Sequence, residues 1–217
     1  MKASVICASL LAGVAMAAPE ASNKKQYKNT PAKPKYDKDC DSNGYYKGAK
    51  GFPIPFTSTY RVKAVPGEVV SMTNQPTGGL PGAVGFYDLG VNSELDTICY
   101  YIRLYNIRGE YQSPADTATH IHESARGRSG PPRIAFPNPQ PVAGKNYRVS
   151  VGCLTGPFET GIINNSTGVD VDTGAGFKVA QIEVNPKGFN ADVHTNFMDA
   201  AQGINAVPGA VRGQLAY

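Results

Sequence analysis

Several features that would assign a function directly are missing from this chain of 217 residues. It lacks the nucleophile, phosphate-binding and paired-carboxylate motifs of hydrolases and transferases, and it has no tandem repeat of the kind that builds a propeller. Charged residues make up only 18% of the chain and the net charge is +4, so the composition gives no support for nucleic-acid binding. No apolar run is long enough to span a bilayer and no hydrophobic tail precedes Tyr217, so we expect no membrane helix and no lipid-anchor signal.

Glycine and proline, in contrast, are plentiful, with 24 and 17 residues, and helices tolerate neither in their interiors. From residue 53 onward, short apolar runs alternate with turn residues. The sequence therefore predicts an all-β domain over residues 53–217, a Greek-key β-sandwich or barrel with at most one short helix. The predicted strands cover residues 57–65, 68–73, 83–89, 95–107, 117–123, 133–136, 147–154, 190–196 and 210–216.

Two of these predictions are specific enough to test directly. Residues 57–65 and 68–73 are predicted to pair as a hairpin around Pro66 and Gly67. Residues 95–107 form the clearest strand, in which Ile98, Tyr100, Ile102 and Leu104 share one side that is predicted to face the core. Residues 177–184 have the spacing of a short helix, although a strand also fits.

The first 17 residues have the pattern of a secretory signal peptide. Lys2 supplies the positive start, residues 5–14 form a short apolar run, and residues 15–17 have the small-x-small pattern of a cleavage site. We therefore expect a secreted, extracellular protein. Residues 18–52 form a lysine-rich arm without an apolar period, which is predicted to be disordered. This arm either attaches to an anionic wall or matrix polymer or is a solvated linker.

Secretion allows disulfides and glycosylation. After removal of the signal peptide three cysteines remain, which cannot all pair within one chain. Cys99 and Cys153 both lie in strand-like segments and are the favoured partners. Cys40 is then a free thiol, an intermolecular bridge, or the true partner of one of them. Two overlapping glycosylation sequons begin at Asn164 and Asn165 in a polar loop.

The chain contains only three histidines, and all of them lie in predicted strands. Side chains alternate along a strand, so His120 and His122 point the same way while Ile121 points to the opposite layer. His194 has a similar context and shares its face with Asp192. Neutral imidazole suits zinc and copper, so these residues predict one Cu(II) or Zn(II) ion held by three histidines, with water, substrate or Asp192 in the fourth position. The alternative is a polar cluster held by hydrogen bonds alone.

Three blocks of sequence carry a resemblance to a known family. They are residues 118–123 with Gly130 and Pro131, residues 189–195, and residues 208–215, which end in Arg212, Gly213, Gln214 and Leu215. In this order they resemble the CHRD domain family, first described in chordin. The resemblance implies an extracellular β-domain, and the family has no established biochemical activity. The chain departs from the family pattern in residues 123–126, at Asp192, and in a longer segment before Pro208.

The strand with His120 and His122 also resembles, more weakly, the copper-ligand strand of copper/zinc superoxide dismutases. This resemblance implies an immunoglobulin-like or superoxide dismutase-like sandwich. A dinuclear site with a bridging imidazole needs more than three histidines, so that site cannot form here.

These observations lead to one main hypothesis and two alternatives. The main hypothesis is a secreted CHRD-like domain that binds a single copper or zinc ion through His120, His122 and His194. The alternatives are a copper-dependent, superoxide dismutase-like redox enzyme, and a structural or interaction module of the cell wall or extracellular matrix without metal. Arg212 either supports the site or guides an anion, or it is a structural arginine that binds loop carbonyls and Asp192. The sequence predicts no oligomeric state.

Overall fold

The computed structural model describes residues 55–166, 168–199, 204–205 and 209–216. The chain divides into two units, residues 1–55 and 56–217, and all the described helices and strands belong to the second. The predicted signal peptide, the predicted basic arm and Cys40 lie outside the described residues.

The described chain is built almost entirely from strands, as the glycine and proline content predicts. The strands are β1 (Ser58–Ala64), β2 (Val84–Asn92), β3 (Thr97–Tyr105), β4 (Thr119–Glu123), β5 (Pro132–Phe136), β6 (Gln140–Pro141), β7 (Tyr147–Thr155), β8 (Ile163–Asn164), β9 (Val171–Asp172), β10 (Phe189–Val193), β11 (Met198–Asp199), β12 (Ile204–Asn205) and β13 (Val211–Gln214). One α-helix, α1 (Ala180–Val184), and two short 3-10 turns, η1 (Pro66–Glu68) and η2 (Pro186–Gly188), complete the described elements.

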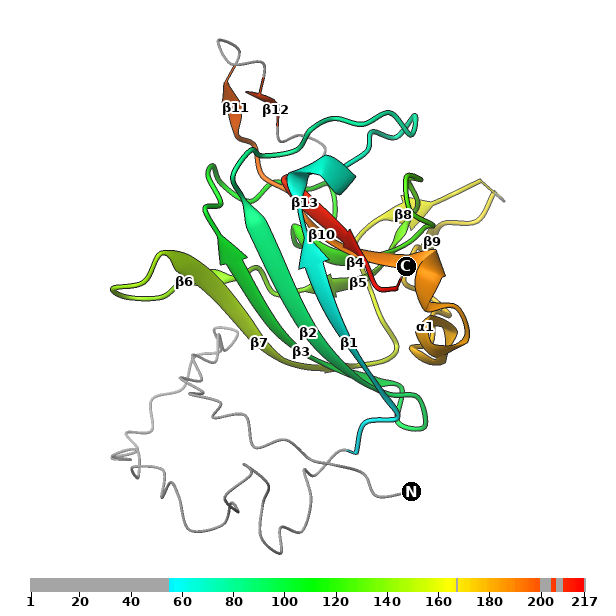
Figure 1. Cartoon of the computed structure of the whole chain (residues 1–217). Coiled ribbons are helices and arrows are strands. Elements are labelled where there is room, and N and C mark those ends of the chain that lie inside the picture. Colours follow the sequence, from blue (N-terminus) through cyan, green and yellow to red (C-terminus); the bar gives the residue numbers. More distant parts are fainter. Residues whose placement is uncertain (1–54, 167, 200–203, 206–208, 217) are drawn as a thin grey trace, which may run out of the picture. The chain divides into compact units, whose positions relative to one another are not determined.

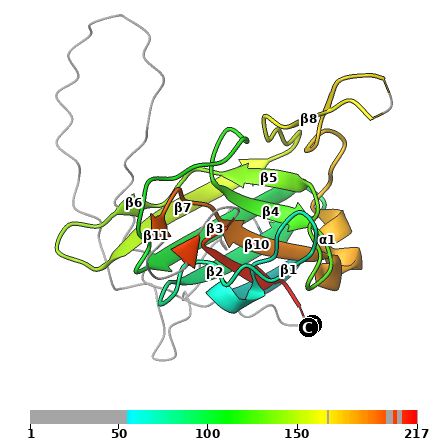
Figure 2. The same cartoon turned by 90° about the horizontal axis from the view of Figure 1, so that it is seen from above.

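Two antiparallel sheets form the body of the domain (Figures 1 and 2). The first sheet has the strand order β1-β2-β3-β7-β6, and the second has the order β13-β10-β4-β5. Two small ribbons, β8-β9 and β11-β12, lie outside them. The prediction of an all-β sandwich with at most one short helix is confirmed. None of the helices in the described segments is long and apolar enough to cross a membrane.

The hydrophobic core lies between the two sheets and contains side chains from both. In β3, Ile98, Ile102 and Leu104 have no exposed surface, which confirms the predicted inward side of this strand. Ile121 of β4 and Ile134 of β5 are equally buried in the facing sheet. Complete burial of one such side chain contributes roughly 1.5–3 kcal/mol. The core therefore determines which side of each strand faces inward.

The predicted hairpin between residues 57–65 and 68–73 is wrong. β1 pairs with β2 instead, with Tyr60 opposite Leu89. Pro66 and Gly67 lead into the turn η1 rather than into a second strand, and Val70 makes only an isolated bridge with Pro76. Proline has no backbone N–H to donate to a ladder, which favours the turn. The segment 190–196 is also shorter than predicted, because β10 ends at Val193.

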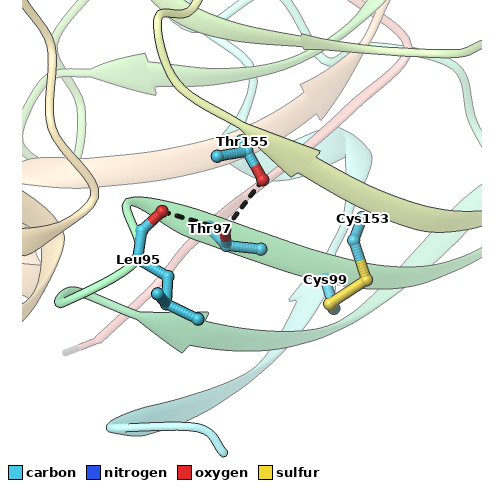
Figure 3. Close-up of a disulfide and its surroundings, with 5 residues drawn as sticks. All are labelled: Leu95, Thr97, Cys99, Cys153 and Thr155. Carbon is cyan, nitrogen blue, oxygen red and sulfur yellow. Dashed lines mark hydrogen bonds between the residues drawn. A yellow bond between two sulfur atoms is a disulfide. The ribbon is translucent and has the colours of Figure 1, made fainter. Parts of the chain in front are cut away.

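A disulfide joins the beginning of β3 to the end of β7 (Figure 3). It links Cys99 and Cys153, the pair that the sequence favours, and these residues lie directly opposite each other in the ladder. Near the same strand ends, the Thr97 and Thr155 hydroxyls lie 2.8 Å apart, within hydrogen-bond distance. The disulfide closes a loop with a sequence separation of 54 residues. This loop contains β4 and β5, so the disulfide encloses the segment that carries His120 and His122.

Replacing Cys99 and Cys153 together by alanine is expected to lower the free energy of unfolding by up to about 4 kcal/mol, because the open chain gains loop entropy in the unfolded state. Urea denaturation followed by circular dichroism measures the change. A reducing agent should destabilise the wild type in the same direction and leave the double variant unaffected. A double variant as stable as the wild type would contradict this account.

Candidate metal centre

The candidate centre lies on the outer face of the second sheet, where β4 and β10 run side by side. The register places His120 opposite Asp192 and His122 opposite Asn190. Ile121 and Ala191 alternate with these residues and enter the core. His194 follows directly after β10, and its backbone N–H donates to the carbonyl of Ala118, 2.8 Å away. The end of β10 therefore stays attached to the start of β4.

The three imidazoles converge on the carboxylate of Asp192. His120 Nδ1 lies 3.5 Å from Asp192 Oδ1, His122 Nε2 lies 3.3 Å from Oδ2, and His194 Nε2 lies 3.1 Å from Oδ2. One potential ligand atom from each of the four residues lies within 4.8 Å of the other three. The structure thus brings together the three histidines and the aspartate that the sequence singles out.

Two backbone carbonyls determine which imidazole nitrogens face the centre. His120 Nε2 lies 2.8 Å from the carbonyl of Thr117, and His122 Nδ1 lies 2.8 Å from the carbonyl of Gly130. A carbonyl oxygen only accepts, so these two nitrogens carry the hydrogen and donate it. In the neutral rings, His120 Nδ1 and His122 Nε2 then have lone pairs directed toward Asp192. A carbonyl on the remote ring nitrogen is a typical way to orient a histidine ligand.

Three polar atoms in this cluster are buried without a hydrogen-bond partner among the described residues. They are His120 Nδ1, His122 Nε2 and Asp192 Oδ1. An unsatisfied buried polar atom costs about 1–3 kcal/mol, and buried polar atoms usually have partners. Two lone pairs beside a carboxylate are also mutually repulsive unless a positive charge lies between them. The arrangement therefore needs a cation, either a proton or a metal ion.

Burial and mutual contact set the protonation of the cluster. Burial raises the pKa of Asp192, but the charges of His122 and His194 outweigh it and hold this pKa well below its usual value. Burial lowers the pKa of His120, and the contact with Asp192 does not restore it. Burial also lowers the pKa of His122, but Asp192 outweighs burial and the pKa is raised. Asp192 is thus a carboxylate at neutral pH, and His120 is a neutral imidazole.

Access to the cluster is uneven. The side chain of His120 is 1% exposed and that of Asp192 is 11% exposed, whereas His122 and His194 are 16% and 18% exposed. The centre is therefore closed around His120 and less covered beside His122 and His194.

Arg212 lies on the neighbouring strand β13, opposite Asp192. Its guanidinium donates to the carbonyl of Ala125 at 3.1 Å and to the hydroxyl of Ser124 at 3.3 Å. The amide of Gln214 donates to the Ser124 carbonyl, and the amide of Asn190 donates to the Ser124 hydroxyl. These contacts hold the segment that returns to Gly130 and its carbonyl. The structural role predicted for Arg212, binding of loop carbonyls, agrees with this geometry.

Some contributors to the centre are not visible in the sequence. The carbonyls of Thr117 and Gly130 have no sequence signature, because every residue has a carbonyl. At Gly130, however, the residue type itself is a sequence signal. A Cβ at this position would lie 2.1 Å from the carbonyl oxygen of Glu123. Only glycine allows this close approach.

The remaining predicted residues lie elsewhere. Glu123 pairs with Arg133 at 2.7 Å, so its carboxylate is not in the cluster. The side chains of Asn164 and Asn165 are exposed, and their glycosylation remains a prediction. Cys99 and Cys153 belong to the first sheet.

No protein-family model, curated protein or solved structure matches this chain.

Replacing Arg212 by methionine is expected to lower the free energy of unfolding by about 2–3 kcal/mol, because it removes a charged donor and leaves the Ala125 carbonyl without this partner. Chemical denaturation measures the change. Arg128→Met is the matched control, since Arg128 lies in the same loop and is exposed. Equal stability of the two variants would show that Arg212 does not hold the loop.

Proposed function

We propose that this protein binds one divalent copper or zinc ion through His120, His122, Asp192 and His194. The observation that carries the proposal is the convergence on one point of three buried acceptor atoms that have no hydrogen-bond partner among the residues the structure describes. A metal ion at this point would accept the lone pairs of His120 and His122 and neutralise the carboxylate. The cost of burying these atoms would then be offset by coordination.

The donor set supports the choice of metal. Three imidazole nitrogens and a carboxylate oxygen are borderline to hard ligands, which suit Zn(II) and Cu(II) better than Cu(I). The Thr117 and Gly130 carbonyls orient two of the rings before any ion arrives. Such preorientation reduces the entropy that binding must overcome. The four donors would complete a tetrahedral site, or three of them would leave one position for water or substrate.

A secreted, CHRD-type domain is the setting that we propose for this site. The order of the three sequence blocks supports the family, and two of those blocks supply the four residues of the cluster. The disulfide between Cys99 and Cys153 supports an oxidising compartment, because such bonds are rare where thiols are kept reduced. The competing hypothesis is a structural or interaction module in which a proton, rather than a metal, occupies the cluster.

A second candidate function is copper-dependent redox chemistry on superoxide or a similar small oxidant. The partial exposure of the His122 and His194 side chains favours it, because this is the less covered side of the cluster. A redox-active ion would supply the electron transfer, and the chain would supply orientation and access.

After loading with Cu(II) or Zn(II) and dialysis, the wild-type protein is expected to retain one ion per chain, measured by elemental analysis. His120→Ala and Asp192→Asn are expected to lose it, because each removes a ligand. Excess metal should also raise the melting temperature of the wild type, since an ion at 100 times its Kd stabilises the folded state by about 2.7 kcal/mol.

Asp170→Asn is a suitable control for loading. It makes the same charge change as Asp192→Asn at an exposed residue outside the cluster, so this variant should retain the ion. A wild-type protein that holds no stoichiometric metal, or a His120→Ala variant that holds as much as the wild type, would remove the proposed site and favour the metal-free module.

The copper-loaded protein is expected to consume superoxide faster than an equal concentration of free copper, if the open side of the cluster serves this reaction. A superoxide-consumption assay measures the rate, and His194→Ala should abolish the excess because it removes a ligand on the exposed side. A rate no higher than that of free copper would reject the enzyme and leave the metal-binding function intact.

A further inference from the structure

The outer face of the first sheet carries a group of aromatic rings, whereas the candidate metal centre lies on the second sheet. Alternation along β2, β3 and β7 places Phe86, Tyr101, Tyr105 and Tyr147 on the side away from the core. The centroids of Phe86 and Tyr105 are 5.9 Å apart, and those of Tyr105 and Tyr147 are 5.2 Å apart. We call these four residues the aromatic face.

The aromatic face is open in the described part of the chain. All four rings are partly exposed, and Val151, which lies beside Tyr101 in the ladder, is 39% exposed. A row of neighbouring aromatic side chains on a solvated sheet is more than pairwise sheet stabilisation requires. Exposed apolar surface of this kind is typical of binding sites.

Cations border the aromatic face. The guanidinium of Arg103 lies 4.9 Å from the centroid of Tyr101 and 5.7 Å from that of Phe86. Asp88 pairs with both Arg103 and Arg61, so one carboxylate serves two arginines. Lys63 is exposed opposite Phe86 in the ladder. The border is therefore net positive. The Arg61 side chain is paired with Asp88 but is 83% exposed, so an anionic partner can contact it.

We propose that the aromatic face binds an acidic polysaccharide, a chain of sugar rings with carboxylate groups. Flat aromatic rings can stack on the apolar faces of sugar rings, and tyrosine hydroxyls can bind sugar hydroxyls. The bordering arginines match the carboxylates in charge and geometry. The Cys99–Cys153 disulfide lies on this same face and favours an oxidising compartment, where polysaccharides are available and nucleic acids are uncommon. This binding is independent of the proposed metal site.

Calorimetric titration with a galacturonic acid oligomer and with its methyl ester tests the proposal, because the ester keeps the sugar rings and removes the charge. The full chain is expected to bind the acid form more tightly than the ester. Tyr101→Ala should weaken the binding of both forms about three- to tenfold, which is the usual contribution of one aromatic contact. Arg61→Gln should weaken the binding of the acid form alone.

Arg128→Gln is the matched control, since it makes the same charge change on an exposed loop away from the aromatic face. If Tyr101→Ala fails to fold, Arg61→Gln still tests the proposal. The Arg61 side chain is largely solvated, so this variant should fold. Three results would overturn the proposal. They are no binding of either oligomer, equal weakening by Arg61→Gln and Arg128→Gln, and tighter binding of a single-stranded oligonucleotide than of the acidic sugar. His120→Ala should bind the oligomer like the wild type. The polysaccharide proposal can therefore be tested even if the proposed metal site proves wrong.

Discussion

The candidate metal centre depends on one register, the pairing of β4 with β10. It places His120 opposite Asp192, and alternation turns both side chains outward while Ile121 and Ala191 enter the core. A slip of one residue would move the imidazoles into the core and Ile121 into solvent. Because Ile121 is completely buried, the hydrophobic effect opposes that slip. The core therefore fixes the polar cluster, although the four residues of the cluster are not among the hydrophobic core residues.

The same register also brings electron-rich atoms that repel one another close together. It directs two imidazole lone pairs and a carboxylate toward one another in a largely buried site, and three of these atoms have no hydrogen-bond partner in the described part of the chain. The network of Arg212, Asn190 and Gln214 with the following loop keeps the segment leading to Gly130 in place. The Gly130 carbonyl is thereby kept within hydrogen-bond distance of the His122 ring. A bound cation would relieve the repulsion, and binding that is restricted to the folded state would stabilise the fold.

The sequence predicts the parts of this structure that depend on periodicity. The inward side of β3, the common face of His120 and His122, and the shared face with Asp192 all follow from alternation. The sequence does not predict which strands pair, as the failure of residues 68–73 shows, because pairing depends on contacts between distant segments. It also cannot predict the carbonyls of Thr117 and Gly130, since a backbone acceptor has no residue type. Recognition of the four residues was therefore possible, but the orientation of their rings was not.

The two outer faces of the sandwich have different chemistry, and this difference has a physical origin. On the second sheet, the loop that follows β4 forms hydrogen bonds with polar side chains of β4, β10 and β13, so charge there is compensated within the protein. On the first sheet the aromatic face is partly exposed, so its arginines can exchange Asp88 for an external anion at little cost. The core lies between the two faces, and substitutions at distant sites without shared partners act almost independently. A small ion on one face and a polymer on the other therefore need not compete.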